Sequence, residues 1–376
     1  MRRGEEVMVP EAEFRSYYGQ PIIKAPIWHE PHMPLYLYLG GTSGAASVIS
    51  AVATLTGHDR LGLTARVTAA AGAAAGAGFL VAELGRPERF LNMLRVFKPT
   101  SPMSVGSWLL AAHSGLTALA AASALVTAGS GPRVSARSVL RLLVRFVSRV
   151  PARSVPQVPF WSILRVSARF VARVPVWPVP RIPGRAGLRI PALPGRIARV
   201  LPAVGDAAAL AAVVTGPLMS TYTAVLVADT AVPAWHEGHP ELPFLFAGSA
   251  LAGAGAVGML ATPRREAGPA RAVAVLGAAV ETVAGAVMEH RLGLVGEPYR
   301  LGRSGRLMRT ARVLTVGGAL LATVAGRGRA LTALSGLALS AGALRTRFGV
   351  LAAGRASAAD PKYTVVPQRE RLEAGG

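Results

Sequence analysis

The sequence predicts an all-α integral membrane protein, a bundle of about eight transmembrane helices arranged as two four-helix halves. Of its 376 residues, 51% are hydrophobic and only 16% are charged, whereas soluble domains carry about 25% charged residues. The mean hydropathy is +0.41. The apolar residues also occur in long blocks, and about 20 consecutive apolar residues cross the roughly 30 Å hydrocarbon core of a bilayer.

Eight blocks reach or approach this length, and the last two are shorter than the others. They are Pro34–Leu55, Leu63–Ala82, Val105–Val126, Ala203–Ala228, Leu242–Leu260, Ala270–Met288, Met308–Ala325 and Ala330–Leu344. Residues 1–33 form a polar arm whose charged start does not resemble a cleavable signal peptide. Residues 349–376 form a polar tail, and we expect an extended chain from Arg345 onwards.

A basic insertion, residues 127–202, separates the third and fourth predicted helices. Fourteen arginines and no acidic residue lie between Gly131 and Gly205, so this segment supplies +14 of the formal net charge of +22. Six arginines recur every fourth residue and share one helical face: Arg133, Arg137, Arg141, Arg145, Arg149 and Arg153. Two interpretations stay open, a basic helix on anionic lipid headgroups and a poorly ordered low-complexity insertion.

The same insertion decides the expected orientation in the cell membrane. If its arginines are counted, the positive-inside rule places the insertion in the cytoplasm, which is the orientation that we expect; without them the bias reverses. Nucleic-acid binding is not expected, because no aromatic platform or recognisable module accompanies the arginines.

Acidic residues are rare inside the predicted helices, and each costs about 2.5–3.5 kcal/mol at the centre of a membrane helix. Glu83 ends the second block and Asp229 the fourth. Glu281 lies inside the sixth block and Glu289 closes it. Glu281 has no charged neighbour within seven positions, so it is either a proton relay or ligand-binding group, or a neutral acid hydrogen-bonded to a neighbouring helix.

Three tyrosines lie in the predicted helices. Tyr36 and Tyr38 open the first, where an aromatic belt at the membrane surface is expected, and this is the interpretation that we favour for Tyr38. Tyr222 lies deeper, in the fourth. A buried phenol can donate a hydrogen bond to a quinone carbonyl, but a polar role within the bundle is an alternative on residue type alone.

The connection between the second and third helices is too apolar for a solvated loop and predicts a short helix at the membrane surface. Its apolar side would consist of Phe90, Leu91, Leu94 and Phe97. The helix would contact either lipid or a peripheral subunit, and Trp108 would anchor the third helix.

No metal or redox centre is expected on this chain. It contains no cysteine, so it supplies neither disulfides nor thiolate ligands for an iron–sulfur cluster. His29, Glu30 and His32 could contact a metal, but no further ligand is evident, and a polar cluster at headgroup level is the favoured interpretation.

The run ELGRPERFLNMLRVFKPTSPMSVGSW (Glu83–Trp108) resembles the signature of the NrfD/polysulfide-reductase membrane-subunit family. PLYLYLGGTSGA resembles the opening helix of that family, and TYTAVLVADTAVPAW followed by LPFLFAGSALAGAGA resembles its fourth and fifth helices. PYRLG also fits. The resemblance covers most of the chain outside the arginine-rich insertion, about which the family pattern says nothing.

The resemblance implies an eight-helix membrane subunit of a molybdopterin oxidoreductase complex. Such a subunit binds no haem, exchanges electrons with quinone, expected to be menaquinone, and docks a ferredoxin-like 4Fe–4S subunit joined to a molybdopterin catalytic subunit. The quinone would lie near the first, second and fourth helices, where Tyr36, Tyr222 and Glu83 match family positions. At the position of Tyr36 this sequence differs from a relative, which has histidine there. The basic residues of the connection are the expected docking contacts: Arg86, Arg89, Arg95 and Lys98.

Two other functions stay open. A pure membrane anchor would hold its partners without touching quinone. A proton- or ion-translocating protein would need charged groups converging at mid-membrane, and only Glu281 clearly lies there.

Overall fold

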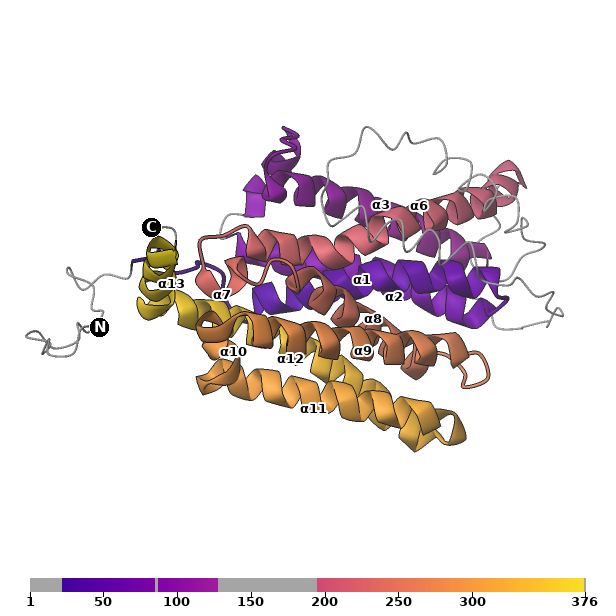
Figure 1. Ribbon diagram of the computed structural model, residues 1–376. Coiled ribbons are helices and arrows are strands. Elements are labelled where there is room, and N and C mark those ends of the chain that lie inside the picture. Colours follow the sequence, from indigo (N-terminus) through magenta and orange to yellow (C-terminus); the bar gives the residue numbers. More distant parts are fainter. Residues whose placement is uncertain (1–21, 85–86, 128–194, 375–376) are drawn as a thin grey trace, which may run out of the picture.

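Helices make up all the regular structure in the part of the chain that this computed structural model describes, residues 22–84, 87–127 and 195–374. Figure 1 shows the long helices side by side along one axis, with the start of α1 and the C-terminal α13 at the same end of the bundle. The long helices are α1 (His32–Leu55), α2 (Asp59–Glu83), α3 (Pro102–Thr127), α6 (Gly195–Ala228), α8 (Leu242–Ala261), α9 (Gly268–Arg291), α11 (Gly302–Val324) and α12 (Arg329–Ala359).

Short helical elements connect the long helices or extend them at the bundle ends. They are η1 (Pro87–Leu94), α7 (Pro233–His236), η3 (Gly293–Gly296), α10 (Glu297–Arg300), η4 (Ala325–Arg327) and α13 (Lys362–Ala374). Gly57, at φ 76°, reverses the chain between α1 and α2 in a backbone conformation that favours glycine. Prolines open α8 and α9, where the missing N–H would have no partner within the helix.

The predicted fold class is confirmed, and the chain is a multi-pass membrane protein. Seven described helices are long and apolar enough to cross a bilayer, and they match the first seven predicted blocks. The eighth block lies within α12, which is 31 residues long and carries four arginines, and α12 is not among those seven.

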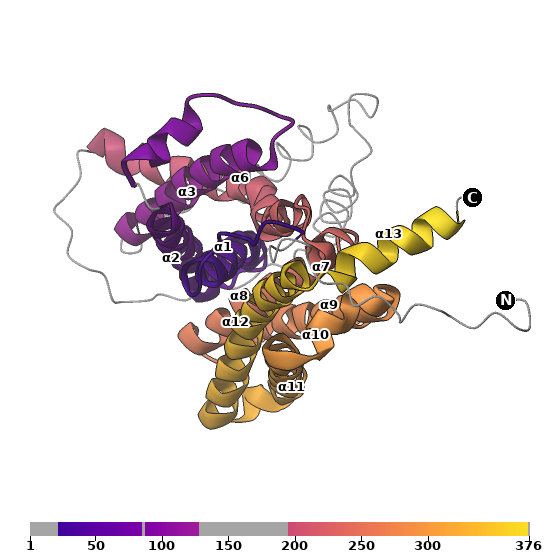
Figure 2. The same cartoon turned by 90° about the vertical axis from the view of Figure 1, so that its left-hand side faces the viewer.

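The eight long helices of the described chain pack as two halves of four, and Figure 2 shows the two halves end on. In the first half α1 packs against α2 and α6, and α3 packs against α2 and α6. In the second half α8 packs against α9 and α12, and α11 packs against α9 and α12. The halves meet where α8 and α12 contact α1, and where α8 contacts α6.

Glycines let the helix backbones touch within each half. A side-chain carbon on Gly44 of α1 would collide with the carbonyl oxygen of Gly216 on α6, and one on Gly216 would collide with that of Gly44. Gly248 and Gly277 bring α8 and α9 together in the same way. Because lipid supplies no hydrophobic force between membrane helices, such close packing is a main source of their association.

Large apolar side chains lie on the outer surface of the bundle. Val313 on α11 is 72% exposed, Leu320 is 66% exposed and Val283 on α9 is 62% exposed. In water these residues would form an aggregation-prone surface, whereas in a membrane they face lipid.

The C-terminal expectation is wrong. The chain does not become extended at Arg345, because α12 continues to Ala359 and α13 follows it. Val350 and Leu351 are each 1% exposed, so the last turns of α12 contribute to the core.

The other sequence expectations concern the connections. A short helix is present after α2 as the 3-10 helix η1, but it ends at Leu94, so that Phe97 lies beyond it. The fourth long helix begins at Gly195 rather than at Ala203. The arginine-rich residues 128–194 lie outside the described part of the chain, so their interpretation stays a prediction.

Candidate functional site

Glu83, the last residue of α2, contacts the segment that leads into α1. Its Oε1 accepts a hydrogen bond of 2.6 Å from the backbone N–H of His29 and lies 3.2 Å from the Nδ1 of that residue. Its Oε2 lies 3.5 Å from Nδ1 of His32. The carboxyl group is 8% exposed, and Oε2 has no hydrogen-bond partner in the protein.

Tyr36 and Tyr222 meet between α1 and α6. The hydroxyl of Tyr36 donates to that of Tyr222 over 3.3 Å, and Tyr36 is fully buried. Gly106 on α3 provides the space for the second ring, since a side-chain carbon there would collide with Tyr222. We call Tyr36, Gly106 and Tyr222 the tyrosine layer.

One helical turn links the tyrosine layer to Glu83. His32 and Tyr36 are four residues apart on α1, so they are neighbours on one helix face. His32 also lies beside Phe79 of α2, with a distance of 6.3 Å between the ring centroids. The structure therefore brings together the three residues that the sequence singled out for quinone, at the end of the bundle where α1 begins.

A second polar layer lies deeper in the same half, and the sequence analysis missed it. His113 on α3 is fully buried, and its Nε2 and Nδ1 lie 3.0 Å from the hydroxyl of Ser43 and 2.8 Å from that of Thr215. We call these three residues the histidine layer. The two layers are seven residues apart on α1, α3 and α6, about 10 Å along the helix axes.

Comparison with known families shows which family the chain belongs to. The sequence model of the family described as "Polysulphide reductase, NrfD" matches residues 21–358, nearly the whole chain. The chain belongs to the NrfD family. Members of this family are membrane subunits of molybdopterin oxidoreductase complexes, and the family is associated with quinone. No curated protein matches the chain.

Two features of the NrfD site fit a quinone headgroup. In the tyrosine layer the proton of Tyr36 is used in the bond to Tyr222, which leaves the hydroxyl proton of Tyr222 free to be donated to a carbonyl oxygen. Oε2 of Glu83 is a buried acceptor that has no hydrogen bond in the protein, with Nδ1 of His32 3.5 Å away, and buried acceptors in native proteins usually have a hydrogen-bond partner.

The expected docking residues are only partly described. Arg86 and the side chain of Arg89 lie outside the described part of the NrfD chain. Arg95 and Lys98 are exposed, beside Phe97, which is 57% exposed and packs edge-on against Trp108 with a centroid distance of 6.2 Å. The connection therefore presents basic and apolar groups together.

Residues 28–32 join the two halves at this end of the bundle. The indole of Trp28 stacks on that of Trp235, with the ring centroids 5.3 Å apart. Glu30 pairs with Arg303 over 2.5 Å, and Arg355 donates to the carbonyl of Trp28. Among the described residues, no group of three or more histidine, aspartate or glutamate side chains is placed to hold a metal ion.

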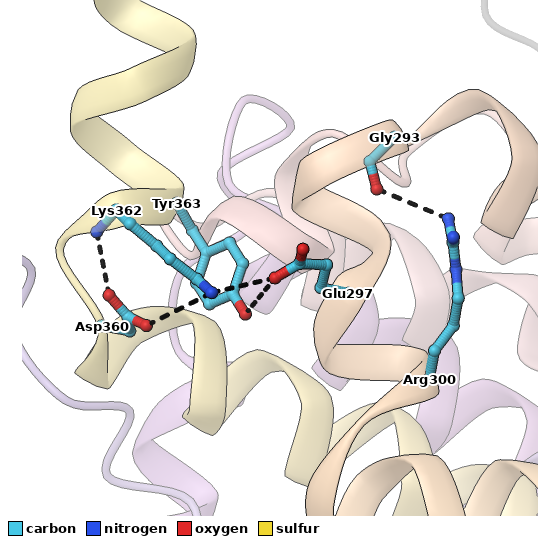
Figure 3. A network of polar contacts seen from close by, with 6 residues as sticks. All are labelled: Gly293, Glu297, Arg300, Asp360, Lys362 and Tyr363. Atoms are coloured by element: carbon cyan, nitrogen blue, oxygen red, sulfur yellow. Dashed lines mark hydrogen bonds and ion pairs between the residues drawn. The ribbon is translucent and has the colours of Figure 1, made fainter.

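The C-terminal helix is held at the same end by the polar network of Figure 3. Lys362 donates to the carboxylate of Glu297 over 2.9 Å, and Tyr363 donates to the same oxygen over 3.2 Å. Asp360 accepts the backbone N–H of Lys362. The hydrogen bond from Lys362 lowers the pKa of Glu297 below its ordinary value.

Glu281 and Tyr38 lie away from the tyrosine layer. Glu281 is 5% exposed on α9, in the second half, and accepts a hydrogen bond from Thr346 of α12. Tyr38 is half-buried, and its ring packs against Gly253 of α8, with Cε2 3.3 Å from the position of a side-chain carbon there.

Proposed function

We propose that this chain is the quinone-binding membrane subunit of a molybdopterin oxidoreductase complex, with Tyr36, Tyr222 and Glu83 around the quinone headgroup. One observation carries the proposal: three polar residues from three helices converge at one end of the first half, where the family places its quinone. We expect the quinone to be menaquinone.

The site residues would position the headgroup and handle its protons. A bound quinone supplies two-electron chemistry coupled to two protons. Tyr222 would donate a hydrogen bond to one headgroup oxygen, and Tyr36 fixes the orientation of the Tyr222 hydroxyl through the bond of 3.3 Å. Glu83 would hold a proton at Oε2, the oxygen without a hydrogen bond in the protein, and its low exposure keeps competing water away.

Electron exchange would take place with a separate subunit. The chain has no cysteine and therefore no thiolate ligand for an iron–sulfur cluster. The connection after α2 adjoins Glu83 and displays Arg95 and Lys98. We assign to it the docking of a ferredoxin-like 4Fe–4S subunit, which would connect to a molybdopterin catalytic subunit.

The test is quinone-linked turnover and quinone binding in the purified complex. Glu83→Gln keeps the shape of the side chain but cannot exchange a proton, so turnover should be abolished while the complex stays assembled. Tyr222→Phe should weaken menaquinone binding about two- to tenfold, the effect of one lost hydrogen bond. Tyr38→Phe is the matched control and should change neither quantity.

A pure anchor makes a different prediction. If quinone binding and turnover are unchanged in both Glu83→Gln and Tyr222→Phe, the assigned site is wrong. If the assembled complex binds no quinone at all, the chain is an anchor.

A further inference from the structure

The second half contains a buried polar centre that quinone binding does not use. Glu281 of α9 is 5% exposed, Thr315 of α11 is 1% exposed and Arg347 of α12 is 1% exposed. Thr346, beside Arg347, donates to Oε1 of Glu281. A carboxyl and a guanidinium group inside a membrane are costly, and residues of this kind in transmembrane segments are usually functional.

Arg347 is held in place and provides a countercharge. One of its terminal nitrogens donates to the backbone carbonyl of Phe246 on α8 over 2.8 Å, and the guanidinium lies 3.7 Å from the centre of the Phe246 ring. It interacts electrostatically with Glu281. The positive charge favours a carboxylate at this position in an environment that would otherwise exclude one.

Several polar atoms of this centre have no protein partner. They are Oε2 of Glu281, Oγ1 of Thr315, and Nε and the second terminal nitrogen of Arg347. Buried polar groups without protein partners are usually bound to ordered water.

A cavity beside Glu281 has room for water. Its volume is about 20 Å³, and Glu281, Thr315 and Thr346 are among its lining residues. A water molecule needs roughly 10–15 Å³ of such space and two to four polar partners. Oε2 of Glu281 and Oγ1 of Thr315 are two suitable partners, since neither atom has a hydrogen bond of ordinary geometry in the protein, although the Thr315 side chain also interacts with Glu281.

The cavity also extends to Arg312 of α11. Arg312 lines it and forms an ion pair of 2.5 Å with Glu289, near the end of α9 where α10 begins. Arg312 is 42% exposed, so this pair is in contact with the surroundings of the protein. Glu281 lies ten residues before the end of α9, and Figure 1 shows that end of α9 beside α10.

We propose that Glu281 is a proton-exchange site within the membrane. Water in the cavity bonds to Oε2 of Glu281 and to the hydroxyl of Thr315, and it connects the carboxyl group to the Arg312–Glu289 pair. On ionisation the proton leaves Oε2 for this water, and Arg347 compensates the negative charge that remains.

The charged and titratable groups around this site belong to α1, α9, α11 and α12. Arg347 belongs to α12 and Arg312 to α11. Tyr38 of α1 interacts electrostatically with Arg347. The helix α8, which packs against α9, has no ionisable residue between Leu242 and Ala261.

Infrared difference spectroscopy of the purified chain in liposomes tests the proposal without its partners or quinone. A pH change should produce a protonated-carboxyl band that is missing in Glu281→Gln and present in Glu266→Gln, which alters a carboxyl group at the opposite end of α9. In D2O the band should shift within seconds. Absence of a Glu281 band, or a band that stays unshifted for hours, would overturn the proposal.

A second variant pair tests the water. Thr315→Val keeps the shape but removes a partner of the water, so deuterium exchange at Glu281 should slow about tenfold, the factor expected for one lost hydrogen bond. Thr323→Val removes an exposed hydroxyl from the same helix and should leave the rate unchanged. Equal rates in both variants would refute the hydrated path. These readouts do not involve quinone, so their failure is distinguishable from a failure of the quinone assignment.

Discussion

Gly106→Ala should disrupt the tyrosine layer, because the added methyl group occupies the space of the Tyr222 ring. The methyl carbon would collide with Cε2, Cζ and the hydroxyl oxygen of that ring, whereas carbon atoms pack best at roughly 3.5–4.0 Å. The ring must therefore move by about 1.5 Å, which takes its hydroxyl beyond hydrogen-bond distance of Tyr36, now 3.3 Å away. Overpacking costs about 1–3 kcal/mol and the lost hydrogen bond about 0.5–1.5 kcal/mol, so we expect a destabilisation of about 1.5–4.5 kcal/mol.

Gly115→Ala is the matched control for this experiment. Gly115 lies on the same helix, and a side-chain carbon there has no atom within 4 Å. This replacement should stabilise the helix by about 0.5–1 kcal/mol. Unfolding of both variants in detergent compares their stability, and quinone-linked turnover of the assembled complex should fall about 100-fold in Gly106→Ala alone. If the two variants have the same free energy of unfolding and the same quinone-linked turnover, the packing argument for the tyrosine layer is refuted.

Three further variants test other contacts. The pKa of Glu297 is lowered by Lys362, so this contact stabilises the docking of α13 above the ordinary pKa of glutamate and is lost as the pH falls through the lowered value. The protection of α13 against hydrogen exchange, relative to the intrinsic rate at each pH, should therefore fall on acidification, and Lys362→Ala should remove that dependence. Trp235→Phe removes the donor of a buried hydrogen bond of 2.7 Å to the carbonyl of Val350. It should lower the free energy of unfolding by about 2–3 kcal/mol, measured by thermal unfolding. A loss below about 0.5 kcal/mol, the size of a typical surface substitution, would contradict this. His113→Ala leaves two buried hydroxyls without their partner and should destabilise the protein by about 2–4 kcal/mol, whereas His113→Gln should recover part of the loss.

The helices could largely be predicted from the sequence, because lipid requires long uninterrupted apolar segments. Prediction failed at the end of α12, where Arg345 and Arg347 looked like the start of a polar tail. Arg347 is instead buried, since the carbonyl and ring of Phe246 hold its guanidinium. Such partners come from a distant helix, and the order of residues along the chain does not reveal them.

The site was predictable to a different extent. Tyr36, Tyr222 and Glu83 came from the family resemblance, and the structure brings them together through His32. His113 could have been noticed as the one ionisable residue of α3, but its contacts with two hydroxyl groups depend on the packing of three helices. The unpartnered oxygen of Glu83 likewise becomes apparent only when the neighbouring backbone is in place.

The equal spacing of the tyrosine and histidine layers limits how this half of the protein can evolve. One residue inserted between the layers in α1, α3 or α6 would rotate the part of the helix beyond the insertion by about 100°. The residue that this helix contributes to one layer would then point away from that layer, while the other layer would stay complete. Substitutions can adjust each layer separately, but changes in length between them cannot be absorbed by a loop. We therefore expect length variation among related chains to occur in the connections, as with the long arginine-rich segment before α6, and not in these seven-residue intervals.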